Sequence, residues 1–224
     1  IGVGERAGCG LTTGNGNIII GQGAGQGTIT GNCNVSVAYQ GFTALTSGSH
    51  NVTLGTQSSF SLTTGDKNIA IGCRALFNTT TADNNVAVGT SALNSNTTGT
   101  KNTSIGKSSL ASNTTGNCNT ALGVDALTTN STGANNTGIG EHALTNNTTA
   151  NNNTAVGYFS LNTNSTGGQN VGIGCGALRS NTTASENVAV GHSALGANTT
   201  ASCNTAVGCG AMKSNTTGSV NTAF

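Results

Sequence analysis

The sequence contains no proline and no tryptophan, and aromatic residues make up only 3% of its 224 residues, which excludes a large aromatic core. Charged residues make up 6%, and the formal net charge is +1, so the chain carries no electrostatic footprint for nucleic acid or anionic lipid. So little charge also argues against a disordered tail. No apolar run approaches the ~20 residues that span a bilayer, and no signal-peptide pattern opens the chain. We expect a soluble or extracellular chain with no membrane segment, any targeting segment lying outside it.

Asn, Thr and Gly are abundant instead, with 32, 39 and 35 copies, and they follow a strict internal repeat. The later repeats read N-T-A-V-G-x-x-A-L-x-x-N-T-T-G-x-x, and we number positions from the first Asn. Position 4 is always apolar, and position 5 is Gly in every repeat that continues far enough except one, which has Ala38. The asparagines at position 1 recur every 17 residues without insertion or deletion: Asn17, Asn34, Asn51, Asn68, Asn85, Asn102, Asn119, Asn136, Asn153, Asn170, Asn187, Asn204 and Asn221.

A repeat of this length is too short for two helices, which helical solenoid repeats need over about 33 residues or more. One coil of a parallel β-solenoid fits the length and the composition. We therefore predict an all-β fold, a parallel β-solenoid or β-roll of about thirteen coils. In the repeat that begins at Asn85 we expect a strand over 85–88, a turn at Gly89, a second strand over 91–94 and a third face or loop over 96–101.

Alternation along the strand predicts which side chains point inward, because residues two apart share a face. We expect Val86 and Val88 to point into the coil with Leu93, and Ala87 to point out. Either another chain packs closely on this small, uncharged outward column, or small residues merely suit a tight coil. On the first interpretation, a charge at Ala155 would damage the protein more than one at Asn164. The column comprises Ala70, Ala87, Ser104, Ala121, Gly138, Ala155, Gly172, Ala189 and Ala206.

The column of asparagines at position 1 favours a structural role over a functional one. Asn tolerates left-handed backbone, and stacked copies can hydrogen-bond along the axis. The column of glycines fits a turn that needs positive φ or a close approach of backbone.

Three hexamers, residues 67–72, 84–89 and 186–191, resemble the N-S-V-A-I-G element of trimeric autotransporter adhesin heads, and the Gly-rich stretch 21–27 is similar to the linking turns of those heads. The resemblance implies a left-handed parallel β-roll with three chains side by side on a cell surface. The adhesin repeats are shorter and lack the N-T-T-G segment. The longer form of the repeat also resembles those of phage and viral tail-fibre proteins.

A second column of asparagines, at position 12, forms N-x-[ST] acceptors for N-glycosylation, which are surface features in a secreted protein. These are candidate glycan sites, or else a polar ladder that faces water: Asn96, Asn113, Asn130, Asn147, Asn164, Asn181, Asn198 and Asn215. Two places on, regular threonines offer a possible ice-binding column: Thr98, Thr115, Thr132, Thr149, Thr166, Thr183, Thr200 and Thr217.

Seven cysteines leave at least one thiol free or intermolecular. Only Cys203 and Cys209 are near enough in the coil to be a candidate disulfide. There is no C-x-x-C for a metal, and the histidines (His50, His142, His192) and aspartates (Asp66, Asp83, Asp125) are too scattered to form a catalytic triad. We therefore expect no enzyme, no cofactor and no metal site.

The first coils differ, because Leu11, Leu45 and Leu62 occupy position 12. We expect one repeat domain over 1–224, with variant coils over 1–72, in which this face turns inward, regular coils over 73–224, and no sequon ladder before Asn78. Both ends fall inside a repeat, so we expect a segment of a longer fibre. Three functions remain open: a structural and adhesive fibre, homotrimeric, on a cell or virion surface; a single-chain N-glycosylated fibril; and an ice-binding solenoid.

Overall fold

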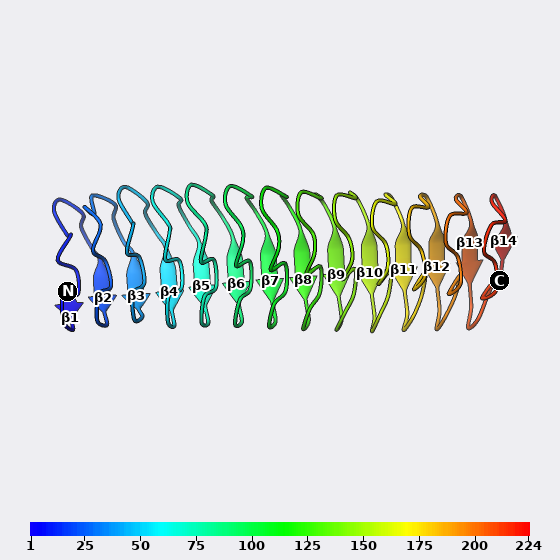
Figure 1. Ribbon diagram of the computed structural model, residues 1–224, viewed down its shortest axis with the longest axis horizontal. Helices are drawn as coiled ribbons and strands as arrows, with labels where there is room; N and C mark the ends of the chain where they lie inside the picture. Colours follow the sequence, from blue (N-terminus) through cyan, green and yellow to red (C-terminus); the bar gives the residue numbers. More distant parts are fainter. The chain divides into compact units, whose positions relative to one another are not determined.

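The computed structural model describes residues 1–224 and divides the chain into two compact units, Ile1–Thr115 and Gly116–Phe224. Each unit is a parallel β-solenoid, as predicted, in which every coil contributes one short strand (Figure 1). The first unit contains β1 (Gly2–Val3), β2 (Ile18–Ile20), β3 (Val35–Val37), β4 (Val52–Leu54), β5 (Ile69–Ile71), β6 (Val86–Val88) and β7 (Thr103–Ile105). The second contains β8 (Thr120–Leu122), β9 (Thr137–Ile139), β10 (Thr154–Val156), β11 (Val171–Ile173), β12 (Val188–Val190), β13 (Thr205–Val207) and β14 (Thr222–Ala223).

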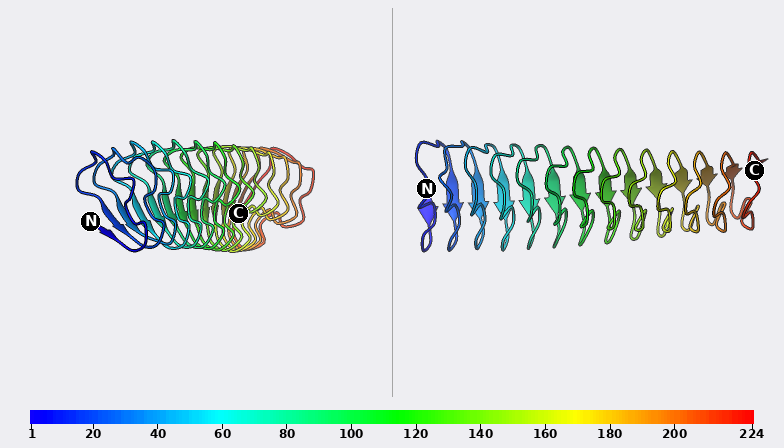
Figure 2. Two further views of the ribbon diagram at one scale, coloured as in Figure 1. Left: turned by 60° about the vertical axis from the view of Figure 1, so that its left-hand side comes forward. Right: turned by 45° about the horizontal axis from the view of Figure 1, so that its top comes forward.

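Within each unit, every strand pairs in parallel with the strand of the next coil, in strict register. Val86 lies beside Thr103 in the first unit, and Thr154 lies beside Val171 in the second. Each pairing therefore joins residues that are 17 apart in sequence, and side chains from the same repeat position stack into columns. Figure 2 shows how successive coils follow one another within each unit.

The strands are only two or three residues long because the backbone turns on both sides of them. Position 17 has positive φ, as at Lys101 (φ 59°), and position 5 is a glycine at φ 137° in Gly89. A Cβ added to Gly89 would lie 2.5 Å from the carbonyl oxygen of Gly106 in the next coil, so both the dihedral and the close approach require glycine here.

The segment after this glycine is a turn rather than the predicted second strand. In the repeat that begins at Asn85, Ser91 and Leu93 adopt φ values of 58° and 50°, which lie in the left-handed region and not in the extended one. The prediction of a strand over 91–94 was therefore wrong, because residues in that conformation cannot continue a strand.

The orientation of the strand side chains is the reverse of the prediction. Ala87 at position 3 is fully buried inside the coil, whereas Val86 and Val88 are only half-buried on the outer face. The interior is thin, since a Cβ added to Gly138 at this position would come within 3.3 Å of the Leu127 side chain. Position 3 is small because the coil is tight, which is the second of the two interpretations above.

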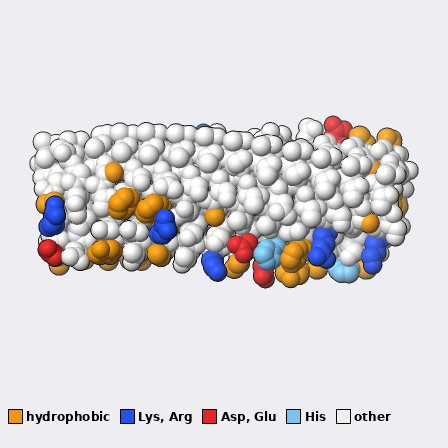
Figure 3. All heavy atoms as spheres, viewed as in Figure 1, with side chains coloured by type: hydrophobic (Ala, Val, Ile, Leu, Met, Phe, Trp, Pro, Cys, Tyr) orange, Lys and Arg blue, Asp and Glu red, His pale blue; other side chains and the backbone are white.

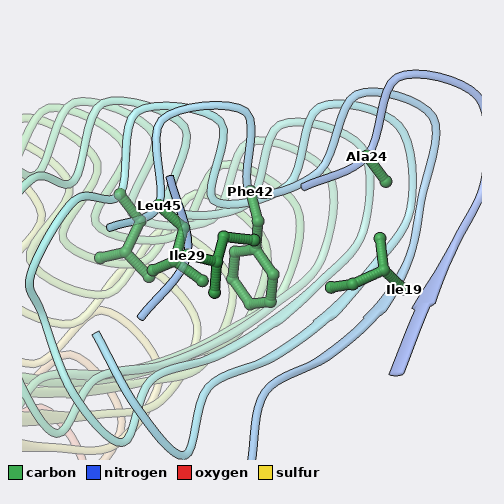
Figure 4. Packing of buried hydrophobic residues seen from close by; sticks show 6 residues of the cluster. Ile19, Ala24, Ile29, Phe42 and Leu45 are labelled. Carbon is green, nitrogen blue, oxygen red and sulfur yellow. The ribbon is translucent and has the colours of Figure 1, made fainter. Parts of the chain in front are cut away.

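The core is formed by the small residues at positions 3 and 8 and by the leucine at position 9. Leu93 and Ala92 are fully buried, as are their counterparts in most coils. The first coils carry larger side chains: Ile19, Ala24, Ile29, Phe42, Leu45 and Leu62 form one buried cluster, much of which Figure 4 shows. Leu45 and Leu62 are fully buried, so position 12 does turn inward in these coils. No helix of the structure has the length and hydropathy needed to cross a membrane.

Candidate functional site

Apart from the exposed threonine column at position 14, two exposed surfaces are candidates for binding. The first is the outer sheet face, which we define as the side chains at positions 2 and 4. In the first unit Leu54 is 47% exposed, and in the second Leu122 and Ile173 are 44% and 40% exposed. Every residue at position 4 is aliphatic from Ile20 to Val207, and position 2 carries Val, Ile or Thr from Ile18 to Thr222. This face is therefore largely apolar and regular.

The second surface is the turn edge, which we define as positions 6, 7 and 10, just after the strand. In both units the coloured side chains of Figure 3 gather at the end of the coil toward which the strands of Figure 1 point. The buried columns repeat the same residues, whereas the turn edge changes from coil to coil. It carries most of the charged residues and five of the aromatic ones: Tyr39, Phe60, Phe77, Tyr158 and Phe159.

In the second unit the turn edge holds a cluster of rings and cations. Phe159 packs against Tyr158 with ring centroids 4.4 Å apart and nearly perpendicular planes, and against His142 at 4.8 Å. The guanidinium carbon of Arg179 lies 5.0 Å from the centre of the Phe159 ring, within the range of a cation–π interaction. The imidazole of His142 also approaches the Glu141 carboxylate at 3.8 Å.

Two hollows lie beside this cluster and share Gly176, Arg179 and Ser193. One, of about 290 Å³, is lined by Tyr158, Phe159, Cys175, Gly176, Arg179, His192 and Ser193. The other, of about 600 Å³, is lined by Gly176, Arg179, Ser180, Ser193, Gly196, Ala197, Lys213 and Ser214. Neither lining includes a carboxylate, and no sequence pattern predicted either hollow.

The first unit has a smaller version of the same surface. Phe60 and Phe77 stack with centroids 5.1 Å apart, and the Arg74 guanidinium carbon lies 4.4 Å from the Phe77 ring centre. A hollow of about 170 Å³ is lined by Glu5, Arg6, Gln22, Gly23, Gln26, Tyr39 and Gln40. Its lining pairs a carboxylate with a guanidinium, so it lacks the net positive charge of the hollows in the second unit.

The asparagines at position 1 form a buried hydrogen-bonded ladder within each unit. Asn153 Oδ1 accepts hydrogen bonds from the backbone N–H and from Nδ2 of Asn170, at 2.9 and 3.2 Å. Asn153 Nδ2 donates to the carbonyl oxygen of Gly167 at 2.9 Å. This side chain therefore satisfies backbone groups that the short strands leave unpaired, which gives the column a structural function.

The sequon asparagines at position 12 are buried, so the expectation that they face solvent was wrong. Asn96, Asn113, Asn130, Asn147, Asn164, Asn181 and Asn198 have no exposed surface, and Asn215 is half-buried. Asn164 Nδ2 donates to Asn147 Oδ1 at 3.1 Å and to the Gly167 carbonyl at 2.8 Å. The side-chain Nδ2 that would carry a sugar is therefore buried and hydrogen-bonded inside the coil, and the fold does not support glycosylation of this column. The hydrogen-bonded ladder of asparagines at position 12 begins at Asn96, whose Nδ2 donates to the Thr79 hydroxyl of the preceding coil.

Position 16 forms a third ladder, which accounts for two of the scattered aspartates. Asp66 Oδ1 accepts from the backbone N–H of Ser49, and Asp83 Oδ1 accepts from that of Asp66, both at 2.7 Å. Both carboxylates therefore connect successive coils. The structure brings no three His, Cys, Asp or Glu side chains close enough together to hold a metal ion.

All seven cysteines are free and exposed, so the candidate disulfide between Cys203 and Cys209 is not formed in the structure. The extended strand β13 separates these two thiols. The Cys203 thiol donates a hydrogen bond to Glu186 Oε2 at 3.4 Å, and Cys209 Sγ lies 4.0 Å from His192 Nδ1. The hydrogen bond to Glu186 and, less strongly, slight desolvation and the carboxylate's charge raise the pKa of the Cys203 thiol.

Comparisons with known proteins add no relative. No family model, no curated protein and no solved structure matches this chain.

Proposed function

We propose that this chain is a non-enzymatic, structural and adhesive segment of an extracellular fibre, exposed on a cell or virion and assembled from three identical chains. The outer sheet face is the observation that carries the proposal. Contiguous exposed apolar surface on a soluble protein marks an interaction site when it is extensive, and Leu54, Leu122 and Ile173 belong to such a surface.

A second copy of this chain fits that face better than an unrelated partner. Successive coils follow at the spacing of paired strands, ~4.8 Å, so the apolar columns of two copies have the same period and can interlock along their length. Homo-oligomers with closed symmetry use such self-matching surfaces. The resemblance to adhesin heads and viral tail fibres supports three chains and a surface location.

The test is the mass of the assembly in solution, measured by light scattering during size-exclusion chromatography. We expect a trimer for the native chain. The double variant Leu122→Lys, Ile173→Lys should be monomeric but folded, because lysines on the sheet face prevent its burial. The matched control Thr149→Lys, Thr183→Lys, at two exposed threonines of position 14, should stay trimeric. A monomeric native chain, or sheet-face variants that keep the native mass, would refute the proposal.

Ice binding remains a second candidate function, because the threonine column at position 14 is exposed from Thr98 through Thr217. Within each unit its hydroxyls repeat at the coil spacing of ~4.8 Å. Thermal hysteresis of the purified chain tests this candidate directly, and a freezing point equal to the melting point would eliminate it. The single-chain glycosylated fibril is no longer favoured, because its sugar-bearing nitrogens are buried.

A further inference from the structure

The two hollows of the second unit exist because glycines interrupt the turn edge. Gly176 stands at position 7, where the two preceding coils carry His142 and Phe159. Gly196 stands at position 10, between Arg179 and Lys213 of the neighbouring coils. A Cβ added at Gly176 would meet only the Ser193 hydroxyl, at 3.7 Å, so the coil has room for a side chain that this residue lacks. Missing side chains thus make a groove flanked by large ones.

The groove is positively charged along its floor and apolar at one end. Arg179 and Lys213 line it, and the His192 imidazole lines its smaller hollow. The charged and titratable groups nearby on the same edge are Glu141, which is engaged with His142, and the thiols Cys175 and Cys209. No carboxylate among the lining residues neutralises Arg179 or Lys213, so the groove presents unpaired cations to a ligand.

The spacing of the two cations suggests the length of the ligand's repeat. Arg179 and Lys213 both occupy position 10 and lie two coils apart, roughly 9.6 Å at the spacing of stacked strands. This is close to the length of a disaccharide in an extended polysaccharide chain. Phosphates along a nucleic-acid strand are spaced more closely than that, so a disaccharide repeat fits the pair of cations better.

The remaining side chains suit a sugar. Tyr158 is 50% exposed at the end of the groove, where its ring can stack on the apolar face of a pyranose. The hydroxyls of Ser180, Ser193 and Ser214 line the floor and can donate to or accept from sugar hydroxyls. The Arg179 guanidinium packs against Phe159, which restrains the orientation of this group before a ligand binds.

We propose that this groove binds a linear acidic polysaccharide, one with a carboxylate or sulfate on every second sugar. Arg179 and Lys213 would bind successive acidic groups, Tyr158 would stack on a sugar ring, and the serines would bind hydroxyls. This proposal specifies the ligand of the proposed adhesive function. It therefore rests on that function, but not on the assembly of three chains. Binding requires only the second unit's turn edge, so it can succeed whether or not the sheet face assembles chains.

The experiment is a titration, by isothermal calorimetry at physiological ionic strength, of the whole chain with four probes. A hyaluronan hexasaccharide supplies a carboxylate on every second sugar, and a κ-carrageenan hexasaccharide supplies a sulfate on every second sugar. Cellohexaose is the neutral control, and a single-stranded oligonucleotide is the competing class. We expect one or both acidic oligosaccharides to bind, and the two arms tell which anion is preferred. No binding of either, equal binding of cellohexaose, or tighter binding of the oligonucleotide would overturn the proposal.

Variants locate the site. Arg179→Thr, Lys213→Thr and Tyr158→Thr should each weaken binding, the first by roughly tenfold or more, because it removes a charge-assisted hydrogen-bonding group. Threonine is already found at position 10 of this unit, at Thr145, and at position 6 in the first unit, at Thr90, so the fold should be retained. Lys107→Thr removes the same charge from the first unit's turn edge and should leave the affinity unchanged. An equal loss in Lys107→Thr and Arg179→Thr would indicate non-specific attraction and refute the groove.

Discussion

Ser36 occupies position 3, where most coils carry alanine, and its buried Oγ has no hydrogen-bond partner. A buried hydroxyl left unsatisfied costs about 1–3 kcal/mol. We therefore predict that Ser36→Ala raises the free energy of unfolding by about 1 kcal/mol, measured by urea denaturation.

The control for this prediction is Ser104, at the same position in another coil of the first unit. Its Oγ donates to the Ser109 carbonyl at 2.8 Å, so Ser104→Ala should lower the free energy of unfolding by about 1 kcal/mol. If both alanines destabilise the chain, the Ser36 hydroxyl is satisfied in solution after all.

Cys203 offers a second prediction about a single residue. The Glu186 carboxylate accepts a hydrogen bond from the thiol and raises its pKa, which disfavours the reactive thiolate. Glu186→Gln should therefore lower this pKa and speed alkylation of Cys203 by iodoacetamide at mildly alkaline pH, followed by mass spectrometry of the peptides. Cys33, at the same repeat position in the first unit, should react at an unchanged rate. An unchanged rate at Cys203 would show that Glu186 does not control this thiol.

The small residues at position 3 and the asparagines at position 12 are both buried, so a charged substitution at either position should destabilise the coil. Ala155 and Asn164 are both fully buried, so a lysine at either position buries an unpaired ammonium group. We predict that Ala155→Lys and Asn164→Lys each lower the free energy of unfolding by more than about 4 kcal/mol. Thr166→Lys, at an exposed position of the same coil, should change it by no more than about 0.5 kcal/mol, and chemical denaturation of the three variants checks the order. Tolerance of lysine at Asn164 would contradict the buried ladder.

The period of the sequence predicted the solenoid, because only one coil of parallel strands fits seventeen residues of this composition. It could not predict the direction of the strand side chains. In a V-A-V strand all three residues are apolar, so alternation alone fits either direction, and the thin interior over Leu127 decides it. The burial of Asn164 was equally hidden, since its partners Asn147 and Gly167 belong to a ladder that exists only after the coils stack.

The hollows on the turn edge lay beyond sequence reasoning for a different reason. Gly176 and Gly196 look like ordinary turn residues in a chain with 35 glycines. Their meaning depends on the large side chains of the coils before and after them, which the sequence places 17 or 34 residues away. A search for glycines at positions where the other repeats carry side chains would have found them.

At the scale of a whole unit, stability should change in steps of one coil. Deleting residues 154–170 removes one complete repeat from the second unit and joins Asn153 to Val171, whose surroundings match those of Thr154. We predict that this variant folds, with circular dichroism like the native spectrum and a smaller denaturant m value, because less surface is buried.

Deleting residues 154–169 is the matched control. It removes one residue fewer. At the junction, the later coils must therefore either pair one place out of register with the coil before them or accommodate one extra residue as a bulge. This chain should unfold at a lower denaturant concentration than the chain without residues 154–170, as followed by circular dichroism. Equal folding of the two deletion variants would show that the ladders do not set the register.

The in-register stacking of identical coils also has a genetic consequence. A gene that gains or loses one whole repeat by unequal recombination still encodes coils that pair with the same kind of neighbour. Variants with different numbers of repeats can therefore all fold. Point mutations on the turn edge alter what the surface presents while the buried ladders persist, as the change from Tyr158 to Cys175 to His192 at position 6 illustrates. The number of repeats and the binding properties of the turn edge can therefore change independently of each other during evolution.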